Sequence, residues 1–159
     1  MVLTIATENP RQDDVLVLLR QADDFALSLY PAENYHGLDV AALEQPGVAF
    51  YVARANGLAL GTAAIVDRGD KSGEVKRMFV TDAARGAGVG RALLEAVEAF
   101  AHTVGISLIQ LETGLPQAAA IALYERSGYV HIPRFGKYLD DPTSYCMEKQ
   151  IQKQPTPAC

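Results

Sequence analysis

The chain has 159 residues, of which 49% are hydrophobic and 21% are charged, and its formal net charge is −5. This length and composition suit one globular domain with its own core, and the acidic balance argues against nucleic-acid binding as the main task. Two cysteines provide neither a disulfide framework nor a zinc-binding spacing, so we expect no metal site and a reducing compartment, the cytoplasm. Neither a signal peptide nor a membrane-spanning apolar run is expected.

The first half of the chain predicts one long helix, one short helix and four strands. Hydrophobic periodicity and turn residues predict a strand at 2–7, a helix at 9–30, a short helix at 38–45, and strands at 48–54, 58–66 and 73–81. Asn9 is expected to cap the long helix, with Pro10 as its first residue and Pro31 as its stop. The Ala-Asn-Gly sequence at 55–57 is typical of a hairpin turn, so the strands around it are expected to be antiparallel.

The second half predicts helices and strands in alternation. The expected elements are a helix at 88–103, a strand at 107–113, a helix at 116–126 that begins at Pro116, and strands at 129–132 and 145–151. Because a helix connects them, the strands at 73–81 and 107–113 should be parallel, whereas the last two should be antiparallel. No repeat or linker divides the chain, so residues 1–151 are predicted to form one domain, followed by a flexible tail at 152–159.

A glycine-rich stretch, Arg-Gly-Ala-Gly-Val-Gly at residues 85–90, connects the strand at 73–81 to the helix that follows. Such a turn gathers backbone N–H groups at the positive end of a helix dipole, and glycine lets a phosphate approach the backbone closely. The stretch matches neither the Walker loop nor the dinucleotide-binding fingerprint, because the residues that follow the glycines differ from those that each motif requires. The stretch predicts a diphosphate cradle; a helix-capping loop without a ligand is the alternative.

The spacing Arg85-x-x-Gly88-x-Gly90 resembles the acetyl-coenzyme A signature of the GNAT superfamily of N-acetyltransferases. The element order agrees with that fold over about residues 1–151, and the Tyr-Glu-Arg-Ser-Gly-Tyr run that starts at Tyr124 resembles a second family segment. The resemblance implies an α/β (α+β) fold. Its mixed, mostly antiparallel seven-stranded central sheet would be flanked by about four helices.

The resemblance also assigns residues to the cofactor, acetyl-coenzyme A. The strand before the glycine loop would splay from its neighbour and offer free main-chain groups to the pantetheine amides. Gln117 stands where many members carry Asn to hold the pantetheine arm; it has the same donor and acceptor groups with one more methylene. The assigned residues are Met78, Phe79, Val80, Arg85, Gly86, Ala87, Gly88, Val89, Gly90, Arg91, Gln117, Ala120 and Tyr124.

The implied reaction is direct attack of a primary amine of a small molecule or peptide on acetyl-coenzyme A, in a ternary complex. Glu74 is the first candidate for the general base and Glu112 the second, and Tyr124 resembles the family's general acid. A backbone N–H near Phe79 or Val80 would stabilise the oxyanion.

Two segments are expected near the acceptor. One contains Glu33, Tyr35 and His36, and the other is the connection at 135–142, rich in aromatic and acidic side chains; an ordinary polar loop is the alternative for each. His131, alone in a strand, is interpreted as structural.

Three functional readings remain open at this level. An enzyme is favoured by the presence of both Tyr124 and Glu74. A non-catalytic acyl-coenzyme A binding or sensing domain and a purely structural glycine-loop domain are the alternatives. The expected partners are the amine substrate and a second copy in a possible homodimer, with neither nucleic acid nor membrane.

Overall fold

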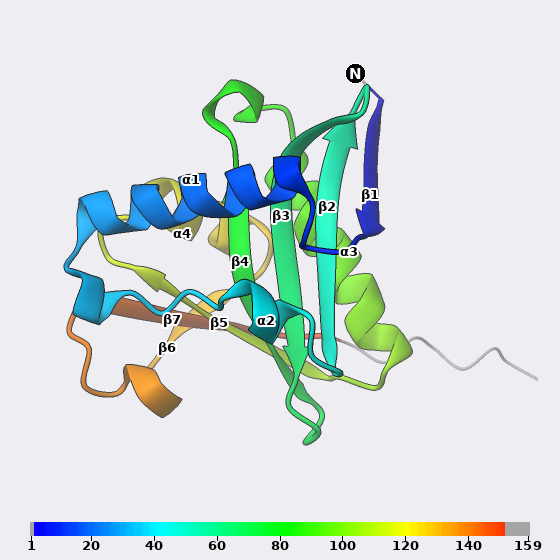
Figure 1. The fold of residues 1–159 in the computed structure, drawn as a ribbon. Helices are drawn as coiled ribbons and strands as arrows, with labels where there is room; N and C mark the ends of the chain where they lie inside the picture. Colours follow the sequence, from blue (N-terminus) through cyan, green and yellow to red (C-terminus); the bar gives the residue numbers. More distant parts are fainter. Residues whose placement is uncertain (1, 152–159) are drawn as a thin grey trace, which may run out of the picture.

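In the computed structural model, which describes residues 2–151, seven strands form one sheet in the order β1-β2-β3-β4-β5-β7-β6 (Figure 1). All neighbouring pairs are antiparallel except β4 and β5, which are parallel. The predicted fold class is therefore confirmed. The strands and α-helices are β1 (Leu3–Thr7), α1 (Asp13–Leu29), α2 (Val40–Leu43), β2 (Val48–Ala55), β3 (Leu58–Asp67), β4 (Ser72–Val80), α3 (Val89–Thr103), β5 (Leu108–Gly114), α4 (Ala118–Arg126), β6 (Val130–Ile132) and β7 (Ser144–Gln150).

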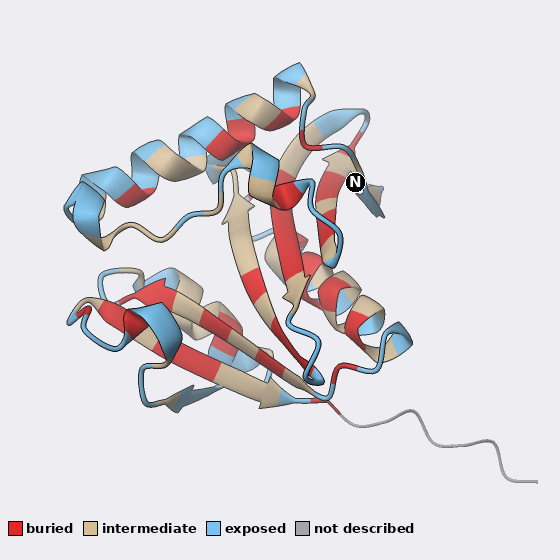
Figure 2. Cartoon of the chain, turned by 60° about the horizontal axis from the view of Figure 1, so that its bottom comes forward, coloured by how far each residue is buried: buried red, intermediate tan, exposed pale blue. Residues whose placement is uncertain are grey.

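Helices cover both faces of the sheet, with α1 and α2 on one face and α3 and α4 on the other (Figure 1). The alternation of side chains along a strand divides the core in the same way. On β2, Ala49 and Ala53 contact the α3 side, whereas Phe50 and Val52 contact the α1 side. The central strands are therefore buried on both faces, and buried residues concentrate there (Figure 2).

The sheet opens between β4 and β5. Residues 72–75 pair with residues 108–111, and beyond this point the two strands diverge (Figure 2). A bulge lies on β4 at the start of the opening, because Ala64 of β3 faces Lys76 whereas Thr62 faces Phe79. Arg77 within the bulge has a φ of 55°, a left-handed conformation that is uncommon for residues other than glycine. The predicted splay of the strand before the glycine loop is thus present.

The sequence places three helix starts too early. The short helix predicted at 38–45 spans only Val40–Leu43, with Asp39 as its N-cap, whose side chain accepts a hydrogen bond from the Ala42 N–H at 2.8 Å. The long helix begins at Asp13 with Gln12 as its N-cap, not at Asn9 and Pro10. The Asn9 side chain instead accepts a hydrogen bond from the Arg11 N–H at 2.9 Å, a local Asx turn that competes with helix capping.

The fourth helix likewise begins at Ala118 rather than at Pro116. The N–H of Gln117 donates to the Gly114 carbonyl at 2.9 Å, so a turn comes before the helix. None of the helices within residues 2–151 is long and apolar enough to cross a membrane. The tail predicted at 152–159 lies outside the described residues.

Candidate active site

A cleft of about 740 Å³ lies at the opening between β4 and β5. Its walls come from α1 and the loop after it, β4, the loop before α3, the end of β5, and α4. Twelve of the thirteen residues assigned to the cofactor line it, whereas Ala87 and the first candidate base, Glu74, do not. The twelve are Met78, Phe79, Val80, Arg85, Gly86, Gly88, Val89, Gly90, Arg91, Gln117, Ala120 and Tyr124.

The glycines of the loop before α3 serve two different purposes. Gly86 and Gly88 both have a φ of 81°, and a Cβ added to either would meet nothing within 4 Å. They make the turn, with Gly88 as the N-cap of α3, and they leave open space above the loop. A Cβ on Gly90 would lie 2.8 Å from Leu123 Cδ2, so this glycine lets α3 pack closely against α4.

The two arginines of the loop make weak surface contacts in this structure. The Arg85 guanidinium lies 3.2 Å from Asp82 and over the Phe25 ring, 5.6 Å from its centroid. Arg91 pairs with Glu95 at 3.2 Å, one helical turn along α3, and its side chain is 78% exposed. Such pairs contribute about 0–1 kcal/mol, so both guanidinium groups are available to an anion at the loop.

Tyr124 and Gln117 are among the residues around α4 that line the cleft. Tyr124 is buried and packs edge-on against Tyr129, with centroids 5.9 Å apart. Burial, and then the charge of Glu112, raise the pKa of the Tyr124 phenol, so it keeps its proton at neutral pH. The Gln117 Nε2 donates to the Tyr30 hydroxyl at 2.9 Å. The amide that the resemblance assigns to pantetheine is therefore already hydrogen-bonded within the protein.

The Glu74 carboxylate contacts three other side chains of the protein. It accepts hydrogen bonds from Tyr138 Oη at 2.5 Å and from Arg68 at 2.9 Å, and Lys76 Nζ lies 3.6 Å away. Burial raises the pKa of Glu74, but Lys76, Tyr138 and Arg68 together outweigh burial and lower it. Because this carboxylate is outside the cleft and stabilised as an anion, its assignment as the base stays a prediction that the geometry does not favour.

Glu112, by contrast, lines the cleft. Its Oε2 accepts a hydrogen bond from Ser144 Oγ at 2.6 Å. Burial raises the pKa of Glu112, and the opposing contributions of Ser144, His36 and Lys76 do not cancel that rise. A carboxylate in this setting both attracts a cation and takes up a proton more readily than an exposed one.

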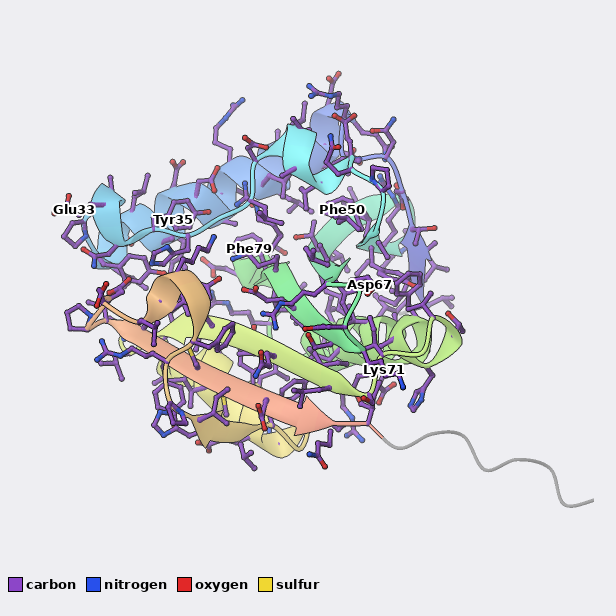
Figure 3. The ribbon with its side chains drawn as sticks, turned by 90° about the horizontal axis from the view of Figure 1, so that it is seen from below. Glu33, Tyr35, Phe50, Asp67, Lys71 and Phe79 are labelled. Carbon is purple, nitrogen blue, oxygen red and sulfur yellow. The ribbon has the colours of Figure 1, made fainter. Side chains whose placement is uncertain are left out.

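The loop after α1 supplies Tyr35 and His36 to the cleft wall, as predicted, while Glu33 is exposed at its outer end (Figure 3). His36 Nε2 lies 2.7 Å from Asp141 Oδ2 in the connection between β6 and β7. This connection thus contacts the loop that lines the cleft, and its place beside the acceptor stays a prediction. His131 is exposed and stacks on Tyr145 with centroids 4.2 Å apart.

Sequence reasoning missed a cluster of Asp23, Arg77 and Tyr35. Arg77 Nη1 lies 2.5 Å from Asp23 Oδ1, and the Tyr35 hydroxyl bonds to the same carboxylate. Arg77 Nε also donates to the Leu38 carbonyl at 2.7 Å. No local sequence pattern predicts this cluster, because its members are far apart in the sequence. The sequence shows only an acidic residue on α1 and a basic residue on β4.

Residues 16–129 match the sequence model of the acetyltransferase (GNAT) family. The chain belongs to the GNAT acetyltransferase family. As a member, it is an N-acetyltransferase, in agreement with relatives that also match it along nearly their whole length. One is a protein of Azospirillum brasilense named IAA acetyltransferase, 46% identical over 150 residues that cover 94% of this chain and 98% of the relative.

Solved structures of this family agree with the fold. An acyl-CoA N-acyltransferase of Klebsiella pneumoniae superposes with a TM-score of 0.79 at 34% identity, and the match covers 93% of this chain and 97% of that one. PaiA N-acetyltransferase of Thermoplasma acidophilum, solved in complex with coenzyme A, gives a TM-score of 0.76 at 14% identity, with 95% and 100% covered. The second likeness concerns the fold alone.

Proposed function

We propose that this GNAT enzyme transfers the acetyl group of acetyl-coenzyme A to a primary amine of a small molecule or peptide, by direct attack in a ternary complex. The observation that carries the proposal is one continuous cleft. It contains the glycine loop, the open main chain of β4, the Tyr124 phenol and the Glu112 carboxylate. These are the parts that such a transfer requires, in one place.

The donor end of the cleft suits coenzyme A. The first N–H groups of α3 have no partner within the helix, and the space above Gly86 and Gly88 is open. A diphosphate there would gain those N–H groups and the arginines beside them. Residues 78–80, beyond the pairing with β5, would offer main-chain hydrogen bonds to the pantetheine amides.

The backbone of β4 also offers an oxyanion donor. The N–H of Thr81 donates to the Leu60 carbonyl at 2.9 Å, on the β3 side. N–H groups of successive strand residues point to opposite sides, so the N–H of Val80 points into the opening. This group would stabilise the tetrahedral oxyanion, and Tyr124, which keeps its proton, would donate it to the leaving thiolate.

The acceptor end suits a cationic amine. An ammonium beside the Glu112 carboxylate would gain a charge-assisted hydrogen bond, and Tyr30, Asn34 and Tyr35 border the same space. The named acceptor of the Azospirillum relative is also a compound to test first, given 46% identity over nearly the whole of both chains. A cytoplasmic location and a homodimer stay predictions.

The experiment is a thermal-shift titration with coenzyme A, followed by thiol release and mass spectrometry across a panel of primary amines, with IAA, the compound in the name of the Azospirillum relative, assayed separately. We expect an increase in Tm with coenzyme A and acetylation of one class of primary amine. Stabilisation without transfer to any acceptor would support an acyl-coenzyme A sensing domain instead. The absence of both would leave only a structural glycine loop.

A further inference from the structure

We propose that His36, oriented by Asp141, is the base that takes the first proton from the acceptor ammonium. This inference rests on the proposed amine acetylation and names a residue for its least defined step. The two side chains come from the loop after α1 and from the connection between β6 and β7, and they meet at the acceptor end of the cleft.

The Asp141 carboxylate is fixed independently of His36. Its Oδ1 accepts hydrogen bonds from Thr143 N at 2.9 Å, Thr143 Oγ1 at 2.6 Å and Asn34 Nδ2 at 2.9 Å. Burial raises the pKa of Asp141, but the Thr143 and His36 hydrogen bonds outweigh it and hold the pKa well below its usual range. Asp141 is therefore an anion that only accepts hydrogen bonds.

This charge state decides which nitrogen of His36 carries the hydrogen. Because Asp141 Oδ2 can only accept, Nε2 at 2.7 Å must donate. In the neutral imidazole the lone pair is then on Nδ1, which is the basic nitrogen. The main chain of His36 is held as well, since its carbonyl accepts from Lys76 Nζ at 2.8 Å.

The charged and titratable groups around His36 come from every neighbouring element. They are Glu112 from β5, Lys76 from β4, and Asp141 and Tyr138 from the connection before β7, with the Tyr138 ring edge-on at 5.0 Å. One side-chain nitrogen of His36 and one carboxylate oxygen each of Glu112 and Asp141 lie within 4.8 Å of one another. An ammonium held by Glu112 would therefore lie close to the His36 ring, and the proposal is that the free Nδ1 faces it.

The protons balance over the reaction. An N–H bond of the ammonium breaks and its proton goes to Nδ1, giving an imidazolium whose Nε2–H remains on Asp141. The freed lone pair forms the C–N bond with the thioester carbon. The C–S bond then breaks, sulfur takes the Tyr124 proton, and the second proton lost from nitrogen replaces it on the phenol. His36 returns the first proton to solvent, which is the one proton that the reaction releases.

The test compares pH profiles of kcat/KM for the wild type, His36→Gln and the control His131→Gln, an exposed histidine on β6. We expect His36→Gln to lose roughly 10²-fold or more near neutral pH, the usual scale for a general base. The loss should shrink as pH nears the amine's own ionisation, and added imidazole should restore part of the rate. His131→Gln should match the wild type.

Asp141 is a positioning residue, and Asp141→Asn tests it separately. Removing the anion that stabilises the imidazolium should lower the rate and move the rising limb of the pH profile to lower pH. A general structural defect would lower the rate without moving that limb. A His36→Gln profile within about threefold of the wild type at all pH values would overturn the inference.

Failure of the proposed function and failure of this inference give different results. If the wild type acetylates no amine, the proposed function fails and this inference falls with it; if the wild type is active and His36→Gln is unchanged, only the inference fails. Should His36→Gln not fold, ¹⁵N spectra of the wild-type histidines replace it, with His102→Gln and His131→Gln assigning the other two signals. A neutral His36 protonated on Nε2 is expected, and one protonated on Nδ1 would overturn the inference.

Discussion

The Arg77 guanidinium on β4 lies 2.5 Å from the Asp23 carboxylate on α1, and its side chain is only 7% exposed. This ion pair links the bulged strand β4 to α1, whose residues line one side of the cleft. The same guanidinium binds the Leu38 carbonyl, so the loop that carries Tyr35 and His36 is tied down as well. The pair thus sets the position of the loop that carries Tyr35 and His36, the proposed acceptor wall, relative to the open strand.

Asp23→Asn should lower stability and weaken acceptor binding. It leaves a buried guanidinium without its anion, which costs about 1–3 kcal/mol, or roughly 3–10 °C in Tm for a chain of this size. KM for the acceptor should rise because the loop after α1 loses its anchor. Calorimetry and steady-state kinetics measure both, with the exposed neighbour Asp24→Asn as the control. Equal behaviour of the two variants would contradict the anchoring role.

Gly88→Glu should abolish the thermal shift given by coenzyme A. The side chain would place a negative charge in the open space where the diphosphate is proposed to lie. Gly57→Glu is a matched control, because Gly57 has a φ of 78° with nothing within 4 Å of an added Cβ, in the β2–β3 turn. Both variants carry the backbone strain, of about 1–3 kcal/mol, but only Gly88→Glu should lose binding. A full shift in folded Gly88→Glu would mean that the diphosphate binds elsewhere.

Tyr124→Phe should lower kcat and kcat/KM together by roughly 10²-fold, the scale for losing a general acid. The ring packing against Tyr129 is kept, so Tm and coenzyme A affinity should change little. Tyr129→Phe is the control: it removes the hydrogen bond to Glu98 at 3.2 Å but leaves the cleft intact. A rise in KM for acetyl-coenzyme A with unchanged kcat would show that the phenol only orients the cofactor.

Glu74→Gln should lower stability near neutral pH and less so in acid. The pKa of Glu74 is lower in the folded chain than its usual value. Its stabilisation is therefore complete above about pH 4.3, the ordinary glutamate pKa, and is lost as pH falls through the folded pKa. The Tm difference from the wild type should shrink correspondingly in calorimetry. Glu95→Gln, which breaks an exposed pair, should show almost no difference at any pH.

The two partly buried glutamates, Glu74 and Glu112, should also differ in kinetics. Glu112→Gln removes the anion that is proposed to face the acceptor, so KM for a cationic amine should rise by roughly tenfold or more, as for one lost charge-assisted hydrogen bond. Glu74→Gln should change kcat/KM much less, because that carboxylate contacts Arg68 and Tyr138 instead of the cleft. A large fall in kcat for Glu74→Gln that lessens at high pH would return the base role to Glu74.

Local and periodic features of the fold were predictable from the sequence. The helical crossover between β4 and β5 dictated their parallel pairing, and Gly86 and Gly88 adopt the left-handed turn that their type suggests. Two of the three misplaced helix starts were wrong because a side-chain turn at Asn9 and a backbone turn at Gly114 compete locally with capping.

Contacts between distant residues were not predictable. Gln117 has the right groups for a cofactor amide, yet its side chain reaches Tyr30, 87 positions away in the sequence. The charge partners of Glu74 and the pairing of His36 with Asp141 are likewise products of the tertiary fold. The sequence shows which chemical groups are present. Whether such a group is free to bind a ligand depends on the tertiary contacts that the fold gives it.

The short parallel seam between β4 and β5 has a consequence for folding. Strands β2, β3 and β4 are consecutive in the sequence and joined by short turns, whereas β5 joins them through only residues 72–75 and 108–111. Contacts between sequence neighbours form at lower entropic cost, so the antiparallel meander of β2, β3 and β4 should assemble before the seam. Amide hydrogens at the seam should accordingly exchange before those of β2 and β3, and a ligand that bridges the opening should slow that exchange most.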